Sequence, residues 1–234
     1  MAFILSLETA TRTCSVALHK DENLLAVQHF HVDKSHSAIL HPIINNLLDY
    51  TETDRKQLSA LAVSAGPGSY TGLRIGVSAA KGICFGLDIP LIAIDTLEAM
   101  AHDITKYNLT GAWLCPMLDA RRMEVYCQIR DAEEKLLMST RPLILDENSF
   151  KNDLENQQII FFGDGSDKCR PLLEPLYPNS LFIKGVLPSA ASVGSLAIDR
   201  YKKGSFDDTA YFTPNYLKEF RATKPKKRVI NQQD

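Results

Sequence analysis

The stretch from Gly66 to Gly76, GPGSYTGLRIG, has residue types that suit anion binding. It follows an apolar run, Leu58 to Ala65, that predicts a buried strand, and it opens a segment with helical spacing, Thr71 to Phe85. A glycine-rich turn between a strand and a helix presents backbone N–H groups to a phosphate or carboxylate. Glycine also lets two backbones approach closely, because it has no Cβ. The loop therefore has two candidate uses, ligand binding and close packing.

Phosphate binding is the weaker of these two interpretations. No lysine followed by serine or threonine comes after the glycines, and Lys81 lies inside the predicted helix, so the loop does not fit the Walker pattern. An actin-like ATPase would also need glycine in the turns 8–13 and 119–124, and neither turn contains one. Phosphate near Arg121 or Arg122 is an alternative, since arginine suits phosphate. We favour arginines that are solvated or paired with acidic residues of the same turn, Asp119 and Glu124.

The histidines and hydroxyl groups predict no metal site and no nucleophile. His36 and His41 are five residues apart, whereas a helical metal pair prefers a spacing of four. His29 and His31 would share one face of a strand, but no third ligand is placed near them. The loop lacks the GxSxG pattern of a nucleophile elbow. We therefore expect no catalytic residue, no metal and no cofactor of this chain's own.

Close packing is the stronger interpretation of the glycine-rich stretch. Gly72, Gly76 and Ala80 follow one another at every fourth residue and form a strip of minimal side chains on one helix face. Each glycine inside a helix costs about 1 kcal/mol relative to alanine, so two of them need a reason. A second helix that approaches closely is such a reason. The candidates are the helix around Ile39 to Leu48 of the same chain and a helix of another chain.

The elements that would position these residues fall into two halves. Residues 3–7, 14–18 and 24–32 predict three antiparallel strands, because the segments between them are too short for helices. A helix over 35–50 follows, with Pro42 inside it predicting a kink or a later start. Strand 58–65, helix 71–85, strand 90–94 and helix 96–107 complete a first half, residues 1–107.

A comparable order of elements begins again at residue 108. Residues 113–118, 124–130, 135–145 and 158–162 predict strands, 146–156 a weak helix, and 189–203 an amphipathic helix. We expect 108–223 to form the second half and 224–234 a disordered tail. The result is an α/β protein with two subdomains, each a mixed sheet flanked by helices. This layout resembles the actin-like (ASKHA, ribonuclease H-like) architecture, which by itself says little about activity.

Composition excludes several classes of protein. The 234 residues are 45% hydrophobic and carry a net charge of −2, so nothing global demands a nucleic-acid partner. Five cysteines without a CxxC pair indicate reduced thiols in the cytosol. No run of about 18 apolar residues is present, so we expect no membrane span. Residues 1–8 are typical of a strand and not of a signal peptide.

The central stretch closely resembles GPGSFTGLRIG, the signature of the TsaB (YeaZ) family. Weaker similarities lie in residues 5–10 (LSLETA), 116–126 (PMLDARRMEVY) and 188–190 (PSA). Residues 214–218 (PNYLK) resemble the family's PxYLR, with lysine in place of arginine. The resemblance extends from residue 5 to about residue 218, and its long central motif is highly specific.

The resemblance implies a non-catalytic, cytoplasmic partner of the threonylcarbamoyl transferase TsaD, which acts with the ATPase TsaE on adenosine beside the anticodon of tRNAs. Such a chain forms homodimers in isolation, contacts tRNA indirectly, and meets a nucleotide only at the interface with its partner. The family docks through its first-half helices, which correspond here to 35–50 and 71–85. The predicted contact residues are Ile39, Ile43, Leu47, Gly66, Pro67, Gly68, Ser69, Tyr70, Thr71, Gly72, Leu73, Arg74, Gly76, Val77 and Ala80.

Two other functions are weighed against this hypothesis. An independent ATPase or small-molecule kinase of the actin-like group is the main alternative. A peptidase is the other, although the sequence offers no nucleophile–base pair and no HxxxH motif. The basic run 224–228 (KPKKR) is interpreted as a solvated tail in preference to a tRNA contact.

Overall fold

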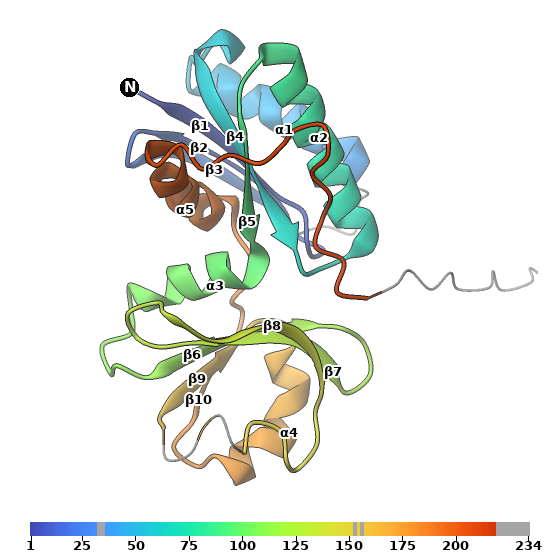
Figure 1. The fold of residues 1–234 in the computed structure, drawn as a ribbon, viewed down its shortest axis with the longest axis vertical. Helices are drawn as coiled ribbons and strands as arrows, with labels where there is room; N and C mark the ends of the chain where they lie inside the picture. The colour runs from blue at the N-terminus through green and yellow to red at the C-terminus, as the bar shows by residue number, and fades with distance from the viewer. Residues whose placement is uncertain (32–35, 152–153, 155–156, 219–234) are drawn as a thin grey trace, which may run out of the picture.

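The computed structural model describes residues 1–31, 36–151, 154 and 157–218. Within them the chain forms two halves stacked along the long axis, each built on one five-stranded sheet (Figure 1). Parallel and antiparallel pairs occur in both sheets, and helices flank each of them. The predicted α/β class with two mixed sheets is therefore confirmed.

The first sheet has the strand order β3-β2-β1-β4-β5. Its strands are β1 (Phe3–Glu8), β2 (Cys14–Lys20), β3 (Asn23–Phe30), β4 (Leu58–Gly66) and β5 (Leu91–Asp95). Short turns join β1, β2 and β3, which pair antiparallel as predicted. β4 pairs parallel with β1, and β5 pairs parallel with β4, because helical crossovers separate them in the sequence.

Two helices cover one face of this sheet and two cover the other (Figure 1). α1 (His36–Tyr50) and α2 (Tyr70–Leu87) bury their apolar stripes on the first face. α1 begins at His36 and continues through Pro42, while Ser35, the first residue of the predicted helix, lies outside the described residues. α3 (Thr96–Thr105) and α5 (Ala190–Lys202) lie on the opposite face.

The second sheet has the order β10-β9-β6-β7-β8. Its strands are β6 (Trp113–Asp119), β7 (Glu124–Arg130), β8 (Leu136–Ile144), β9 (Ile159–Phe162) and β10 (Leu181–Ile183). α4 (Ser166–Leu176) packs in the apolar cluster on one face, and α3 packs on the other. α4 and β10 are not foreseen from the sequence, since Pro171 and Pro175 lie inside the helix and β10 has three residues.

The division of the chain differs from the predicted one after residue 189. α5, expected in the second half, packs on β1, β2 and β4 of the first sheet. Residues 203–218 then run along the first half, and Asp207 forms an isolated bridge with Leu91 of β5. An apolar face of the first sheet is free to receive α5, because α1 and α2 cover only the other face. The predicted tail, 224–234, lies outside the described residues.

Three smaller predictions have clear outcomes. Residues 147–151 form turns in place of the first part of the predicted weak helix, 146–156, and residues 152, 153, 155 and 156 of that prediction lie outside the described residues. β7 and β8 match their predicted positions closely. All five cysteines are free thiols and buried, as their spacing indicates. None of the helices in the described part of the chain combines the length and the apolar character needed to cross a bilayer.

Candidate functional site

The turn between β1 and β2 holds the start of α2. The N–H of Ser69 donates to the carbonyl oxygen of Ala10 at 2.6 Å, and the hydroxyl of Thr9 donates to the carbonyl oxygen of Gly72 at 2.8 Å. The N–H of Gly72 donates to the hydroxyl of Ser69 at 3.3 Å, which caps the helix. Two N–H groups that an anion would need at this helix end are therefore paired within the chain.

Three glycines make this close contact possible. A Cβ at Gly68 would lie 2.4 Å from the carbonyl oxygen of Ala10, and one at Gly72 would lie 2.1 Å from the carbonyl oxygen of Thr9. A Cβ at Gly76 would lie 2.2 Å from the hydroxyl oxygen of Thr9. Because these distances exclude any side chain, close packing accounts for the glycines. Their partner is neither of the two candidate helices but the chain's own β1–β2 turn.

The prediction that Gly72, Gly76 and Ala80 form an open docking strip is wrong. All three are buried, because this stripe is the inward face of α2. The same holds for other predicted contact residues, which lie in the core or under the turn: Ile43, Leu47, Gly66, Pro67, Leu73 and Val77. Ile39, Gly68 and Tyr70 are partly exposed, and Ser69, Thr71 and Arg74 are exposed.

A different stripe of α2 faces outward. Arg74, Ser78, Gly82 and Gly86 also recur at every fourth residue, and all four are exposed. They are displaced by two residues from the buried stripe, which places them about 200° around the helix. A Cβ at Gly82 or Gly86 would have no atom within 4 Å. The sequence contains a signal for this orientation, because a charged residue and a serine mark the outward side of an otherwise apolar helix.

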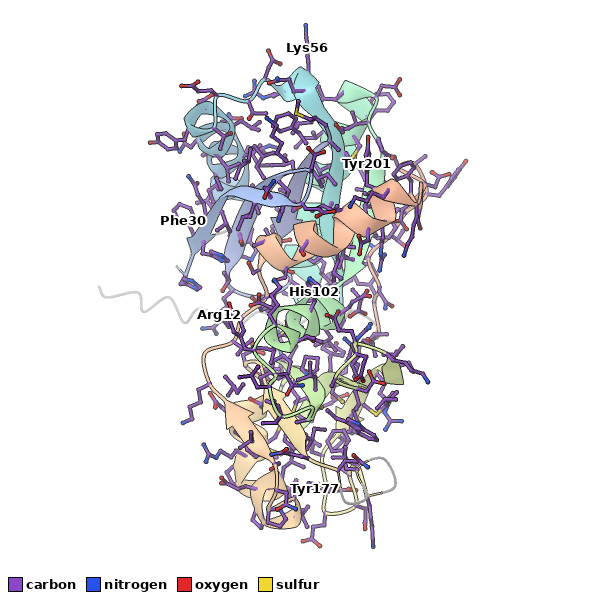
Figure 2. All side chains as sticks on the ribbon, turned by 90° about the vertical axis from the view of Figure 1, so that its left-hand side faces the viewer. Arg12, Phe30, Lys56, His102, Tyr177 and Tyr201 are labelled. Carbon is purple, nitrogen blue, oxygen red and sulfur yellow. The ribbon has the colours of Figure 1, made fainter. Side chains whose placement is uncertain are left out.

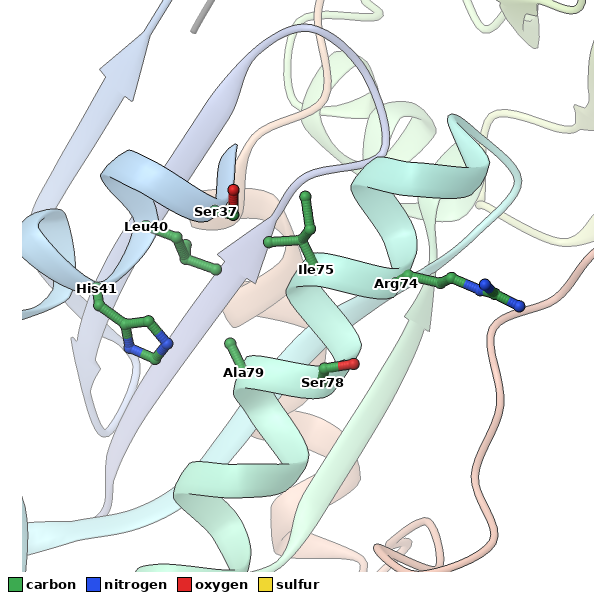
Figure 3. A pocket seen from close by; sticks show the side chains of 7 residues that line it. All are labelled: Ser37, Leu40, His41, Arg74, Ile75, Ser78 and Ala79. Atoms are coloured by element: carbon green, nitrogen blue, oxygen red, sulfur yellow. The ribbon is translucent and has the colours of Figure 1, made fainter. Parts of the chain in front are cut away.

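A groove between α1 and α2 continues this outward stripe. Its volume is about 420 Å³, and Leu40 and His41 of α1 face Ile75 and Ala79 of α2 across it (Figure 3). Beside the stripe, Phe85 is 87% exposed, which is unusual for so large an apolar side chain. We call this surface the helix-pair face, and define it by Ser37, Leu40, His41, Arg74, Ile75, Ser78, Ala79, Gly82, Phe85 and Gly86.

A larger cleft lies where the two halves meet. Its volume is about 1090 Å³, and its walls are the β1–β2 turn, the start of α2, the β6–β7 turn and residues 215–218. Arg12, in the first of these turns, lies at the waist of the molecule between Lys56 at one end and Tyr177 at the other (Figure 2). In the actin-like ATPase layout this is the place where nucleotide would bind.

Glu8, the acid at the end of β1, does not line this cleft. Its side chain is fully buried, and its carboxylate accepts a hydrogen bond from the N–H of Ala10. Burial raises the pKa of Glu8 to about 7, an effect that the hydrogen bond from the N–H of Ala10 offsets only in part. The acid that would approach a nucleotide in an actin-like ATPase is therefore covered by its own turn.

The β6–β7 turn is open by comparison. Asp119 pairs with Lys168, and Glu124 pairs with Lys218, so neither acid pairs with an arginine of the turn as one interpretation expected. Arg121, like Arg122 after it, is exposed to solvent, which agrees with the other part of that interpretation. Burial acts to raise the pKa of Asp119, but the hydrogen bond from Lys168 and the N–H of Arg121 hold it below its usual value.

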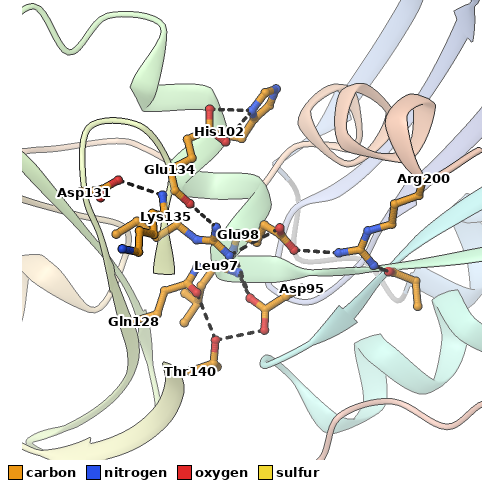
Figure 4. A network of polar contacts seen from close by, with 12 residues as sticks. Asp95, Leu97, Glu98, His102, Gln128, Asp131, Glu134, Lys135, Thr140 and Arg200 are labelled. Atoms are coloured by element: carbon orange, nitrogen blue, oxygen red, sulfur yellow. Dashed lines mark hydrogen bonds and ion pairs between the residues drawn. The ribbon is translucent and has the colours of Figure 1, made fainter. Parts of the chain in front are cut away.

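α3 ties the two halves together behind the cleft. The carboxylate of Glu98 lies 3.5 Å from Arg130 of β7 and 2.9 Å from Arg200 of α5 (Figure 4). One turn further along, Nδ1 of His102 lies 3.0 Å from the carboxylate of Glu134 in the second half. Since the apolar side of α3 also packs on the second sheet, this helix holds the halves in one arrangement.

Comparisons with known proteins agree with this fold. The family model described as "TsaD: tRNA N6-adenosine threonylcarbamoyltransferase" matches residues 30–223. A crystal structure described as an uncharacterized protein with similarity to peptidase YEAZ, from Pseudomonas aeruginosa, superposes with a TM-score of 0.81 at 27% identity. The alignment covers 93% of this chain and all of that one. The fold is therefore the actin-like architecture that the order of elements predicts.

Several relatives compared by sequence carry the name TsaB. The chain is 30% identical over 194 residues to the tRNA threonylcarbamoyladenosine biosynthesis protein TsaB of Bacillus subtilis, covering 80% of each chain. It is 38% identical over 124 residues to the protein of the same name from Escherichia coli, of which it spans about half, 52%. With a family model over most of its length and a relative of this identity, the chain belongs to the TsaB (YeaZ) family.

Proposed function

We propose that this chain is a non-catalytic subunit that docks on a TsaD-type transferase and is required for threonylcarbamoyladenosine formation in tRNA. The observation that carries the proposal is family membership, because the relatives named TsaB are tRNA threonylcarbamoyladenosine biosynthesis proteins. The match to the transferase's own family model supports a common fold for the two partners. Similar subunits often associate through equivalent elements, so a transferase of this fold is a natural partner.

The helix-pair face is the proposed docking surface. Its outward stripe has small side chains, which allow a second helix to approach closely. Phe85 stands beside that stripe and would lose most of its exposed apolar surface on binding. The docking surface is therefore placed on the outward side of α2, opposite the buried strip of Gly72, Gly76 and Ala80.

A role without catalysis is supported by the β1–β2 turn. In an ATPase of this architecture the acid and the backbone of that turn approach the phosphates. Here Glu8 and Thr9 are fully buried and only the rest of the turn lines the cleft, so a nucleotide would have to rearrange the core to reach the acid. These contacts disfavour the alternative of an independent ATPase or kinase.

The remaining parts of the proposal follow from the family resemblance. The chain acts in the cytoplasm with a TsaE-type ATPase, contacts tRNA only through its partner, and forms a homodimer when the transferase is absent. It holds no cofactor of its own, and a nucleotide binds only where the two proteins meet. Size-exclusion chromatography with and without each protein partner tests the homodimer and the two associations, and nucleotide titration of the chain alone and of the complex tests where nucleotide binds.

The docking surface is tested by Gly82→Trp. The helix accommodates this change, because no atom lies within 4 Å of a Cβ at Gly82, but the indole blocks approach of a partner helix. We expect the affinity for the TsaD-type transferase, measured by isothermal titration calorimetry, to fall roughly 100-fold or more. Ser139→Trp is the matched control, since Ser139 is exposed on β8 of the second half. Unchanged binding by the Gly82 variant would refute the placement.

A further inference from the structure

Arg74 is a distinctive residue on the outward stripe of α2. The helix carries two charged residues, Arg74 and Lys81. The ammonium group of Lys81 donates to the carbonyl oxygens of Ala210 at 2.9 Å and Phe212 at 3.1 Å, and so fixes the C-terminal segment on the helix. Of the two charged side chains of α2, Arg74 is therefore the one that is available to contact a partner protein.

Two tyrosines hold the guanidinium group of Arg74 in place. Its central carbon lies 4.2 Å from the ring centroid of Tyr70, which is a cation–π distance. Its Nε donates to the hydroxyl of Tyr216 at 3.4 Å, and the rings of Tyr70 and Tyr216 are 4.6 Å apart. These contacts join residues 142 positions apart in the sequence, so the tertiary structure positions the arginine.

The two terminal nitrogens of this group are available for recognition. In the described part of the chain, no hydrogen bond or ion pair reaches them, although Nε and the ring face of the guanidinium are engaged. Arg74 stands at the edge of the α1–α2 groove, and its guanidinium group points away from α1 (Figure 3). A guanidinium fixed through Nε presents its two terminal N–H groups as a planar fork, the geometry that matches a carboxylate.

We propose that Arg74 determines which partner docks, by forming a bidentate ion pair with one carboxylate side chain of the TsaD-type transferase. This inference rests on the proposed function and names the chemistry of its interface. A carboxylate is favoured over a nucleic-acid phosphate because Arg74 is the single arginine or lysine among the residues that define the helix-pair face. Phosphate backbones are bound by several cations at once.

The stacking contacts make the interaction selective. An arginine that is already ordered loses less side-chain entropy when it binds than one that moves freely in solvent. Arg74 would lie at the edge of an interface that also covers Phe85 and Ile75. An ion pair at that edge would be partly removed from water, so salt would screen it less. A partner without an acid at this point would leave the charge of Arg74 unpaired, which penalises wrong partners.

Affinity measurements with three variants of the full chain test the proposal. We expect Arg74→Ala to weaken binding of the transferase about 30-fold, by calorimetry at 50 mM salt. Arg74→Lys should lose about 10-fold, because an ammonium group cannot form the bidentate contact. Tyr216→Phe removes the hydroxyl that holds Nε and should lose about 2-fold. Lys184→Ala, an exposed lysine that follows β10 in the second half, serves as the control and should bind normally.

Double-mutant cycles identify the acid. Each exposed Asp or Glu of the transferase is changed to its amide and combined with Arg74→Ala; one position should be coupled to Arg74 and the others should be additive. Wild-type affinity of Arg74→Ala, together with lost binding by Gly82→Trp, would overturn the proposal and leave the proposed function standing. If both variants bind normally, the docking face itself is refuted. If Arg74→Ala weakens binding of tRNA but not of the transferase, the ligand is a phosphate and the proposal is overturned.

Discussion

The β1–β2 turn and the β6–β7 turn occupy the same place in the two halves, after the first strand of each sheet. In the first half the base of the turn is sealed, since Thr9 and Ala10 are 0% and 1% exposed, and only its tip, Thr11 and Arg12, is open to the cleft. In the second half Arg121 and Arg122 are exposed and adopt left-handed φ values of 71° and 53°. Both turns line the cleft, but the first is also packed under α2 at its base, whereas the second exposes two consecutive arginines.

The difference comes from where glycines meet the backbone. In the first half Gly68 and Gly72 contact the turn itself, so α2 lies directly on it. In the second half a Cβ at Gly163 would meet the carbonyl oxygen of Met117 at 2.2 Å. Met117 belongs to β6 and not to the turn that follows it. The N-terminal end of α4 therefore packs on β6, where Gly165 meets Leu118, and the helix reaches its turn through the side chain of Lys168, which pairs with Asp119. Two halves with the same strand order can thus differ in how far the turn after the first strand is covered.

The largest expected effect is at Gly72. Gly72→Ala places a Cβ against the carbonyl oxygen of Thr9, so either α2 or the β1–β2 turn must move. We expect the free energy of unfolding to fall by about 3 to 4 kcal/mol. Urea unfolding followed by circular dichroism measures it.

The same substitution on the outward stripe provides the control. Gly82→Ala meets no atom within 4 Å and removes a helix-interior glycine, so it should raise the free energy of unfolding by about 0.5 to 1 kcal/mol. Equal stability of the two variants would contradict the assignment of a sealed and an open face to α2.

The buried carboxyl group of Glu8 makes the stability of the first half depend on pH. Its folded-state pKa, about 7, is above the ordinary value of 4.5, so the folded chain binds the proton more tightly than the unfolded chain. The stability that this group contributes is fully present below pH 4.5 and is lost as pH rises to about 7. Glu8→Gln keeps a neutral acceptor for Ala10 and should be more stable than the parent at pH 8 by roughly 2 to 3 kcal/mol.

Urea unfolding of both proteins from pH 4 to 8 checks this expectation. The difference in unfolding free energy between the Gln variant and the parent should grow between about pH 4.5 and 7 and then level off. A constant difference across this range would show that Glu8 is not the buried titrating group. The pairs around Asp119 have the opposite sign, because a lowered pKa gives stability that is lost as pH falls.

The smallest effect is expected in the open turn. Arg122 has a left-handed φ of 53°, which glycine adopts without strain. Arg122→Gly should therefore raise the free energy of unfolding by about 0.5 kcal/mol. Ala10→Gly in the sealed turn should lower it by about 1 kcal/mol, since it removes a buried methyl group and adds backbone freedom. Calorimetric melting compares them. A marked loss of stability in the Arg122 variant would mean that its side chain makes a structural contact.

Much of the site could be predicted from sequence, but not its orientation. The spacing of Gly72, Gly76 and Ala80 predicts a face of α2 that must pack closely, and that prediction is confirmed. What packs there is decided by Thr9, which is 63 residues away from Gly72. The stripe with Gly82 and Gly86 has the same spacing, so periodicity alone cannot distinguish the inward side from the outward side. The placement of Arg74 on Tyr216 likewise needs a contact that no local pattern encodes.

The amino-acid sequence by itself determined the order of the main strands and helices and the family, because apolar periodicity and a long specific motif are local properties. It did not reveal α4, where Pro171 and Pro175 hide the helical pattern. Tertiary structure alone decided that α5 returns to the first sheet, that the base of the β1–β2 turn is sealed, and which side of α2 faces solvent. These choices depend on which apolar surfaces meet when distant segments are brought together, and burial is a property of the assembled chain.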